Sequence, residues 1–75
     1  MTKILITEFI NQDSLDNLKK NFDVLYNEQL CENKIELQEI IKDYDVLIVR
    51  NKTQLNSDVL KNASNLKFIG RLGVG

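Results

Sequence analysis

The sequence has 75 residues and a net charge of −1 without a run of like charges, so it predicts one small domain and gives no reason to expect binding to nucleic acid or an anionic membrane. Hydrophobic residues make up 43% and charged residues 28%, a soluble globular balance, and no apolar run approaches the ~20 residues of a membrane span. The lone Cys31 excludes an internal disulfide, and the absence of histidine argues against a zinc site and a catalytic thiol.

The first element in chain order is a strand. The opening stretch "MTKILITEFINQ" lacks the long apolar region and the cleavage site of a signal peptide, so we expect a cytoplasmic protein. Its apolar run at residues 3–7 predicts the strand, and residues 11–22 have helical spacing after it. Leu15, Leu18 and Phe22 share one face of that helix, and Asn11 or Asp13 is the expected N-cap.

Three further apolar runs, at residues 22–26, 45–49 and 67–71, predict strands of a parallel sheet buried on both faces. The run at 22–26 is the least apolar of them, and we place it nearest an edge of the sheet. Helices are predicted between the runs. One lies in 33–44, where Asn33 and Glu36 resemble a capping box, and another in 56–66, capped by Asn56 or Ser57.

Strands and helices alternate throughout, and each connection is long enough for a right-handed crossover. The predicted fold class is therefore α/β, a flavodoxin-like parallel sheet of about four strands in the order 2-1-3-4 with flanking helices. Sheets of this kind bind ligands at the carboxyl ends of their strands, beside the point where the strand order reverses. The loops that follow the first, third and fourth strands are therefore the candidate site.

Arg50 follows the third predicted strand directly, and a guanidinium at the mouth of a sheet suits a carboxylate or a phosphate. Asn51 and Thr53 add polar side chains, and the N–H groups of this loop complete a candidate anion pocket. The alternative is that Arg50 stabilises the end of a strand and pairs with an acid such as Asp43 or Asp45. The spacing alone leaves both interpretations open.

Two other loops carry weaker signals. Gly73 and Gly75 allow close approach of the backbone to a ligand, but an ordinary turn between strand and helix explains them better, and they are not the dinucleotide fingerprint G-x-G-x-x-G. Glu8, after the first strand, is interpreted as a solvated carboxylate rather than an acid or base, because no partner for it can be named.

Two other classes of protein with this strand order are disfavoured by the loop residues. Arg50 and Thr7-Glu8 stand where a phosphoacceptor receiver domain needs an aspartate and an acidic pair, respectively, and "TEFINQ" lacks the glycines and hydroxyls of a flavin phosphate loop.

The stretch "VRNKTQLNSDVLKNASNLKFIGRLGVG" resembles the D-isomer-specific 2-hydroxyacid dehydrogenase family, and is most similar to its phosphoglycerate dehydrogenase branch. The family pattern is V-R-S-x-T, a helix, and then G-R-x-G-x-G. Here Asn51 stands in place of the usual serine, and Leu72 in place of the usual alanine. Before Asp45 the similarity is one of pattern only.

The resemblance implies that residues 1–75 are the amino-terminal part of a substrate-binding domain, an incomplete domain without the nicotinamide-binding Rossmann domain. It implies an NAD-dependent oxidation of a D-2-hydroxy acid such as 3-phosphoglycerate, connected with serine biosynthesis, by a homodimer or higher oligomer. The substrate would be bound by six residues, namely Arg50, Asn51, Thr53, Gly73, Val74 and Gly75.

The family's catalytic arginine, glutamate and histidine have no counterpart in this sequence, so we expect the chain alone to be inactive. We also expect the fourth strand and the helices on one face to leave apolar surface and an unpaired edge, so that the chain is marginally stable or self-associates. The alternative function is a non-catalytic anion-binding or small-molecule-binding module of the same fold.

Overall fold

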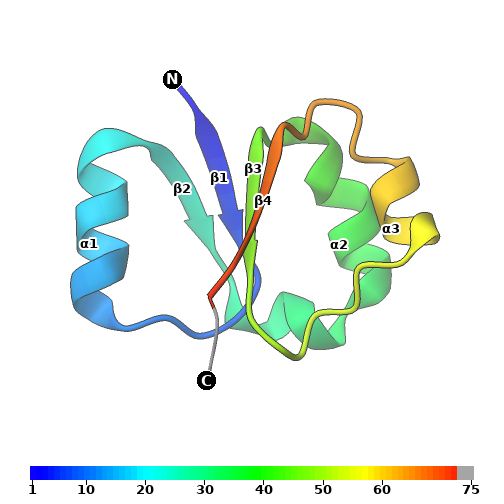
Figure 1. Ribbon diagram of the computed structural model, residues 1–75, viewed down its shortest axis with the longest axis horizontal. Helices are drawn as coiled ribbons and strands as arrows, with labels where there is room; N and C mark the ends of the chain where they lie inside the picture. Colours follow the sequence, from blue (N-terminus) through cyan, green and yellow to red (C-terminus); the bar gives the residue numbers. More distant parts are fainter. Residues whose placement is uncertain (73–75) are drawn as a thin grey trace.

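The computed structural model describes residues 1–72 and shows a single parallel sheet (Figure 1). Its strands are β1 (Lys3–Ile6), β2 (Asp23–Tyr26), β3 (Val46–Val49) and β4 (Phe68–Arg71), in the order β2-β1-β3-β4. The predicted α/β class, the strand order and the edge position of the second strand are therefore confirmed. The predicted glycine loop at 73–75 lies outside the described residues.

The register of the sheet decides which loops meet. β1 lies between β2 and β3, and its Ile6 is opposite Tyr26 on one side and Ile48 on the other. Because the strands are parallel, the residues that follow β1, β2 and β3 emerge at the carboxyl ends of the strands, which lie along one side of the sheet. We call this side the carboxyl edge. At the end of β4 the N–H of Leu72 donates to the carbonyl of Val49 at 2.8 Å, which adds the end of β4 to this edge.

Three helices and two short 3₁₀ turns connect the strands: α1 (Gln12–Asn21), η1 (Glu28–Glu32), α2 (Lys34–Ile40), η2 (Ile41–Asp43) and α3 (Ser57–Lys61). The side chains of Asn11, Asn33 and Asn56 each accept a hydrogen bond from a first-turn N–H, as the sequence predicts for N-caps. The 3₁₀ turn η1 was not predicted, and its buried Leu30 fixes it against the core.

The third helix ends at Lys61, well before the end of the predicted range 56–66. The asparagines that follow it bond to another part of the chain instead of continuing the helix. The side-chain amide of Asn62 donates to the carbonyl of Gln38 at 3.3 Å, and that of Asn65 to the carbonyl of Lys42 at 2.7 Å. These bonds hold the segment after Lys61 against the carbonyls of α2 and η2.

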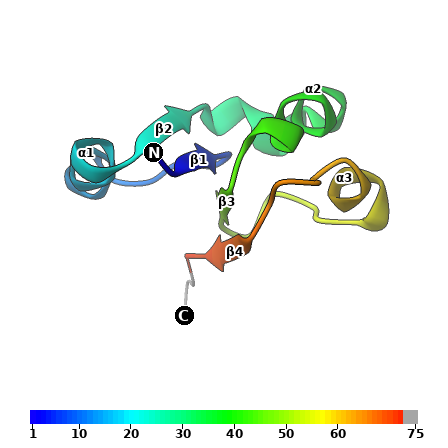
Figure 2. The same cartoon turned by 90° about the horizontal axis from the view of Figure 1, so that it is seen from above.

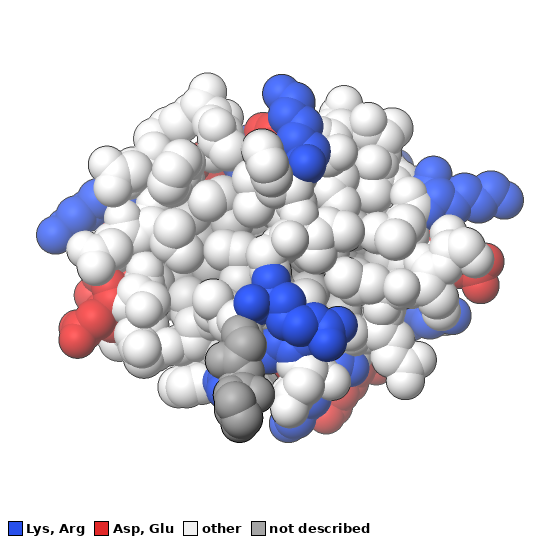
Figure 3. Space-filling view, in the orientation of Figure 1, with Lys and Arg blue, Asp and Glu red and all other residues white. Residues whose placement is uncertain are grey.

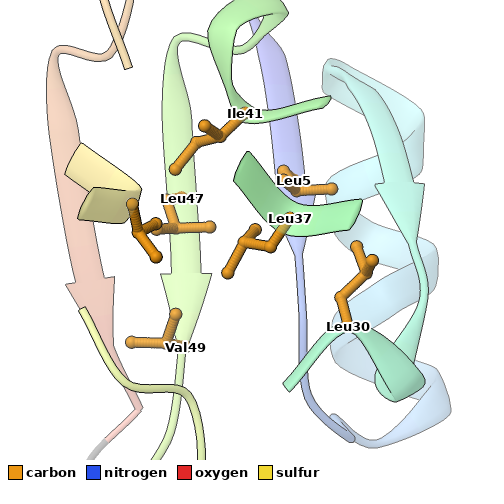
Figure 4. Packing of buried hydrophobic residues seen from close by; sticks show 7 residues of the cluster. Leu5, Leu30, Leu37, Ile41, Leu47 and Val49 are labelled. Carbon is orange, nitrogen blue, oxygen red and sulfur yellow. The ribbon is translucent and has the colours of Figure 1, made fainter. Parts of the chain in front are cut away.

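The helices cover the sheet unevenly. Figure 2 shows α1 on one face, beside β2 and β1, and α2 with α3 on the other face. The α2 side holds a core of fully buried aliphatic side chains, shown in Figure 4: Leu5, Leu30, Leu37, Ile41, Leu47, Val49 and Val59. The second cluster, on the α1 side, is centred on Ile4, Ile6, Ile10 and Leu15.

The strand β4 is poorly covered by the described residues. The side chain of Phe68 is 71% exposed, and those of Ile69 and Leu72 are also exposed. This confirms the expectation that the fourth strand leaves apolar surface uncovered. No helix within residues 1–72 is both long enough and apolar enough to cross a bilayer.

Candidate functional site: the loop after the third strand

The candidate site begins where β1 and β3 end side by side. The pairing of Ile6 with Ile48 places the segment after β1 directly against the segment after β3, and the N–H of Thr7 still donates to the carbonyl of Ile48 at 3.2 Å. Beyond that bond, Glu8 faces residues 50–53. These residues form a loop that leads towards α3, and we call it the β3 loop.

The Glu8 carboxylate accepts hydrogen bonds from three N–H groups of the β3 loop. Its Oε2 accepts from Arg50 at 2.7 Å and from Thr53 at 2.9 Å, and its Oε1 accepts from Lys52 at 2.9 Å. Glu8 is only 4% exposed. An ionised carboxylate that is taken out of water needs compensating donors of this kind. The β3 loop is therefore wrapped around an anion that belongs to the protein itself.

The expectation that Glu8 is a solvated carboxylate is therefore wrong. Burial acts to raise its pKa, but the hydrogen bonds from the Thr53 hydroxyl and from the N–H groups of Thr53, Arg50 and Lys52 act in the opposite sense, and the pKa is lowered overall. Glu8 is consequently ionised at neutral pH. A group that stays deprotonated and has three N–H donors on its oxygens is an anchor for the loop, not a proton donor.

Thr53 reaches inwards from the same loop. Its hydroxyl lies 2.8 Å from the hydroxyl of Thr7, and Thr53 is 4% exposed. The structure therefore brings Thr53 to Glu8 and Thr7, on the inner side of the β3 loop. Contact between Thr53 and a substrate stays a prediction.

Arg50 lies at the mouth of the sheet, as its position after the third strand predicts. Its guanidinium donates through Nη1 to the carbonyl of Phe9 at 3.2 Å. The alternative partners Asp43 and Asp45 form no ion pair with Arg50, and the carboxylate of Asp45 instead accepts from the N–H of Lys3 at 3.0 Å. Asp45 precedes β3 and Arg50 follows it, so they lie at opposite ends of the strand.

A cavity of about 450 Å³ opens between the β3 loop and η1. Arg50 and Lys52 contribute positive charge from the β3 loop, and Glu28 and Glu32 contribute negative charge from η1. Its volume is within the ~300–1,000 Å³ typical of small-molecule sites. The residues that line it are Glu8, Phe9, Glu28, Gln29, Cys31, Glu32, Arg50, Asn51 and Lys52.

Basic side chains are also visible on the surface near this edge. In Figure 3 a group of Lys and Arg side chains lies below the centre of the view, where Figure 1 places the end of β4. Arg71 pairs with Val49 at the end of β4, so it belongs to the same edge of the sheet as Arg50. The carboxyl edge thus gathers cations from two neighbouring strands.

Cys31 lines the cavity but has the environment of an unreactive thiol. Burial raises its pKa first, and the nearby carboxylates of Glu8 and Glu32 raise it further. Its Sγ donates to the carbonyl of Glu28 at 3.2 Å. Cys31 therefore lacks the lowered pKa that activates a thiol as a nucleophile. No group of three or more potential metal ligands occurs within residues 1–72.

Comparison with known proteins identifies the family to which this fold belongs. Residues 4–75 match the family described as "D-isomer specific 2-hydroxyacid dehydrogenase, catalytic domain". The chain belongs to this family, and the resemblance predicted from the sequence is confirmed.

Individual members of the family show which proteins the chain is similar to. The chain is 44% identical over all 75 residues to D-3-phosphoglycerate dehydrogenase of Methanocaldococcus jannaschii, and 35% identical over 75 residues to the protein of that name in Synechocystis. It is 31% identical to (S)-sulfolactate dehydrogenase of Chromohalobacter salexigens over 75 residues. The chain spans 14%, 13% and 24% of the lengths of these three proteins.

Solved structures show the same architecture. The PH0520 protein from Pyrococcus horikoshii matches with a TM-score of 0.82 at 30% identity, over 95% of this chain and 21% of that one. The NADPH-dependent glyoxylate/hydroxypyruvate reductase of Sinorhizobium meliloti matches the fold with a TM-score of 0.67 at 19% identity, over 100% of this chain and 23% of that one.

Proposed function

We propose that this chain is the substrate-binding portion of an NAD-dependent oxidoreductase that acts on a D-2-hydroxy acid such as 3-phosphoglycerate. The phosphoglycerate dehydrogenases among its relatives support this choice of substrate. The observation on which the proposal depends is the position of Arg50, held at the carboxyl edge of the sheet and lining a cavity with Asn51 and Lys52.

In this proposal the phosphate of the substrate lies on the β3-loop side of the cavity. Arg50 offers a planar set of donors that suits phosphate, and the side chain of Asn51 adds a further hydrogen bond. Glu28 and Glu32 on the opposite wall repel the same group. The charges therefore orient the substrate with its phosphate towards Arg50. We assign the substrate carboxylate to the backbone of residues 73–75, on the basis of the family pattern alone.

The residues after β1 do not fit a bound dinucleotide. The segment from Thr7 to Asn11 contains no glycine, and the buried Glu8 carboxylate places negative charge where a pyrophosphate would approach. We therefore propose that NAD, the hydride acceptor, binds to residues other than those described, and we expect the 75-residue chain alone not to reduce NAD. A homodimer or higher oligomer and a role in serine biosynthesis are proposed by family resemblance.

The proposal is tested by replacing Arg50 with alanine in the complete product of its gene. Arg50→Ala should raise KM for 3-phosphoglycerate about tenfold or more, because a hydrogen bond to a charged group is lost. It should change KM for D-glycerate, which lacks the phosphate, much less. Lys20→Ala, a cation removed from the exposed side of α1, is the control and should leave both KM values unchanged.

Two results would contradict the proposal. Equal effects of Arg50→Ala on both substrates would remove Arg50 from the phosphate site. A gene product that binds inorganic phosphate through Arg50 but oxidises neither substrate with NAD would instead indicate the non-catalytic anion-binding module.

A further inference from the structure

The β3 loop is expected to bind an anion, yet it already encloses the buried carboxylate of Glu8. This arrangement needs a physical explanation. Glu8 lines the cavity, but it is only 4% exposed and both of its oxygens already accept N–H groups from the β3 loop, so its carboxylate has no free acceptor to offer a substrate. Burying an ionised group costs free energy unless its partners compensate. The role of Glu8 must therefore lie in how its carboxylate holds the β3 loop.

The segment Thr7–Phe9 holds the β3 loop at several points. Glu8 accepts from the N–H groups of Arg50, Lys52 and Thr53, as described above. The hydroxyl of Thr7 bonds to that of Thr53, and the carbonyl of Phe9 accepts from the Arg50 guanidinium. The backbone and the side chain of Arg50 are thus both fixed by residues that directly follow β1.

This arrangement decides how the β3 loop can bind an anion. The N–H groups of Arg50, Lys52 and Thr53 already have an acceptor, so they are unavailable to a phosphate. The negative charge of Glu8 also repels a second anion from the interior of the loop. A substrate phosphate is therefore left with the side chains of the β3 loop that line the cavity, which are those of Arg50, Asn51 and Lys52.

We propose that Glu8 is a positioning residue for substrate binding, whose carboxylate fills the amide nest of residues 50–53 and so presents Arg50 and Asn51 to the phosphate of the substrate. This rests on the proposed function and adds to it the way in which the phosphate is recognised. The phosphate is bound by side chains, and the amides of the β3 loop bind the protein's own carboxylate. Selectivity for phosphorylated substrates depends on Glu8 although both Glu8 oxygens are already occupied by N–H groups of the protein.

The kinetic test uses the complete gene product with 3-phosphoglycerate and with D-glycerate. Glu8→Gln should raise KM for 3-phosphoglycerate about tenfold, leave kcat within about twofold, and change KM for D-glycerate little, because only the presentation of Arg50 is disturbed. In the double variant with Arg50→Ala, the two effects on KM should be much less than additive, since both act through one guanidinium.

Asp45→Asn is the matched control. Asp45 is also a carboxylate that accepts a backbone N–H, but it lies at the amino end of β3, away from the cavity. Replacing the Asp45 carboxylate with an amide should lower stability without changing the ratio of KM for 3-phosphoglycerate to KM for D-glycerate. If Glu8→Gln behaves in the same way, or if its effect on KM adds fully to that of Arg50→Ala, Glu8 has only a structural role and the proposal is wrong. If Glu8→Gln does not fold, Thr7→Val repeats the test by removing only the hydroxyl bond to Thr53.

A second measurement separates this proposal from the proposed function, because it needs no activity. In the wild-type protein, titration with inorganic phosphate should shift the side-chain NMR signals of Arg50 and Asn51 and leave the amide signals of Lys52 and Thr53 in place. Amide shifts at Lys52 and Thr53 would show that phosphate competes with Glu8 and would overturn the proposal. A wild-type protein that shows the expected phosphate shifts but has no dehydrogenase activity would refute the proposed function alone.

Discussion

Replacing Glu8 with glutamine should destabilise the protein more than an ordinary change from carboxylate to amide. A glutamine oxygen in the place of Oε2 keeps the two bonds from Arg50 and Thr53, although both become weaker because the acceptor is neutral. Its NH₂ group then faces the N–H of Lys52, which stood 2.9 Å from Oε1. Two donors cannot bond to each other, so the N–H of Lys52 is left without an acceptor.

The size of the effect follows from these bonds. Leaving the partly buried N–H of Lys52 without an acceptor costs about 1–3 kcal/mol, and weakening two charge-assisted bonds adds about 0.5 kcal/mol each. We expect Glu8→Gln to lower the free energy of unfolding by about 2–4 kcal/mol. The total for a chain of 75 residues is roughly 4–11 kcal/mol, so the loss is a large share of it.

Urea unfolding followed by circular dichroism measures this loss at pH 7. Asp45→Asn is the comparison, and it should cost about 1 kcal/mol, because one hydrogen bond is involved and the amide can turn its oxygen to accept it. A loss below about 0.5 kcal/mol for Glu8→Gln would refute the reasoning, since surface substitutions usually fall in that range. It would mean that water or a relaxed β3 loop satisfies the N–H of Lys52.

The same comparison has a defined pH dependence. The pKa of Glu8 is lowered in the folded protein, so its contribution to stability is fully present above the ordinary value of 4.5 and is lost as the pH falls through the lowered pKa. The difference in stability between wild type and Glu8→Gln should therefore shrink in acid. A difference that stays constant down to pH 2 would contradict the ionised anchor.

Two further predictions concern the core and the exposed strand. Leu5→Ala should cost about 3–5 kcal/mol in urea unfolding, because Leu5 is 0% exposed in the core beneath α2, whereas Leu60→Ala, at a site 38% exposed, should cost less than about half of that. A loss of equal size at both sites would contradict this packing. Phe68→Lys should reduce self-association of the chain in sedimentation velocity, because Phe68 is 71% exposed on the edge strand β4. A wild-type chain that is monomeric throughout would contradict the expected self-association.

Sequence reasoning missed the role of Glu8 although a usable signal was present. In the strand order 2-1-3-4 the first and third strands are neighbours, so residues at matching positions after them must meet. Ile6 pairs with Ile48, and two steps further along both strands this register pairs Glu8 with Arg50. Treating Glu8 as a carboxylate without a partner ignored the consequence of the predicted topology itself.

The sequence by itself predicted the class of fold, the order of the strands and the family, and it narrowed the N-cap of each helix to one or two residues. These features depend on short-range patterns, namely apolar runs, helical spacing, asparagines before first turns, and a contiguous motif from Val49 to Gly75. The patterns themselves are read from neighbouring residues, whereas the strand order follows from the topology that alternating strands and helices commonly adopt. The position of Arg50 at the mouth of the sheet belongs with them, because it follows directly from the end of a strand.

Only the tertiary structure decided what the β3 loop binds within the protein and where the third helix ends. Glu8 and Thr53 are 45 residues apart, and Asn62 and Gln38 are 24 apart, so their hydrogen bonds depend on how the sheet and helices come together. Whether a buried carboxylate is tolerated depends on donors that reach it from across the fold. That balance of desolvation against hydrogen bonding has no signature in a stretch of neighbouring residues.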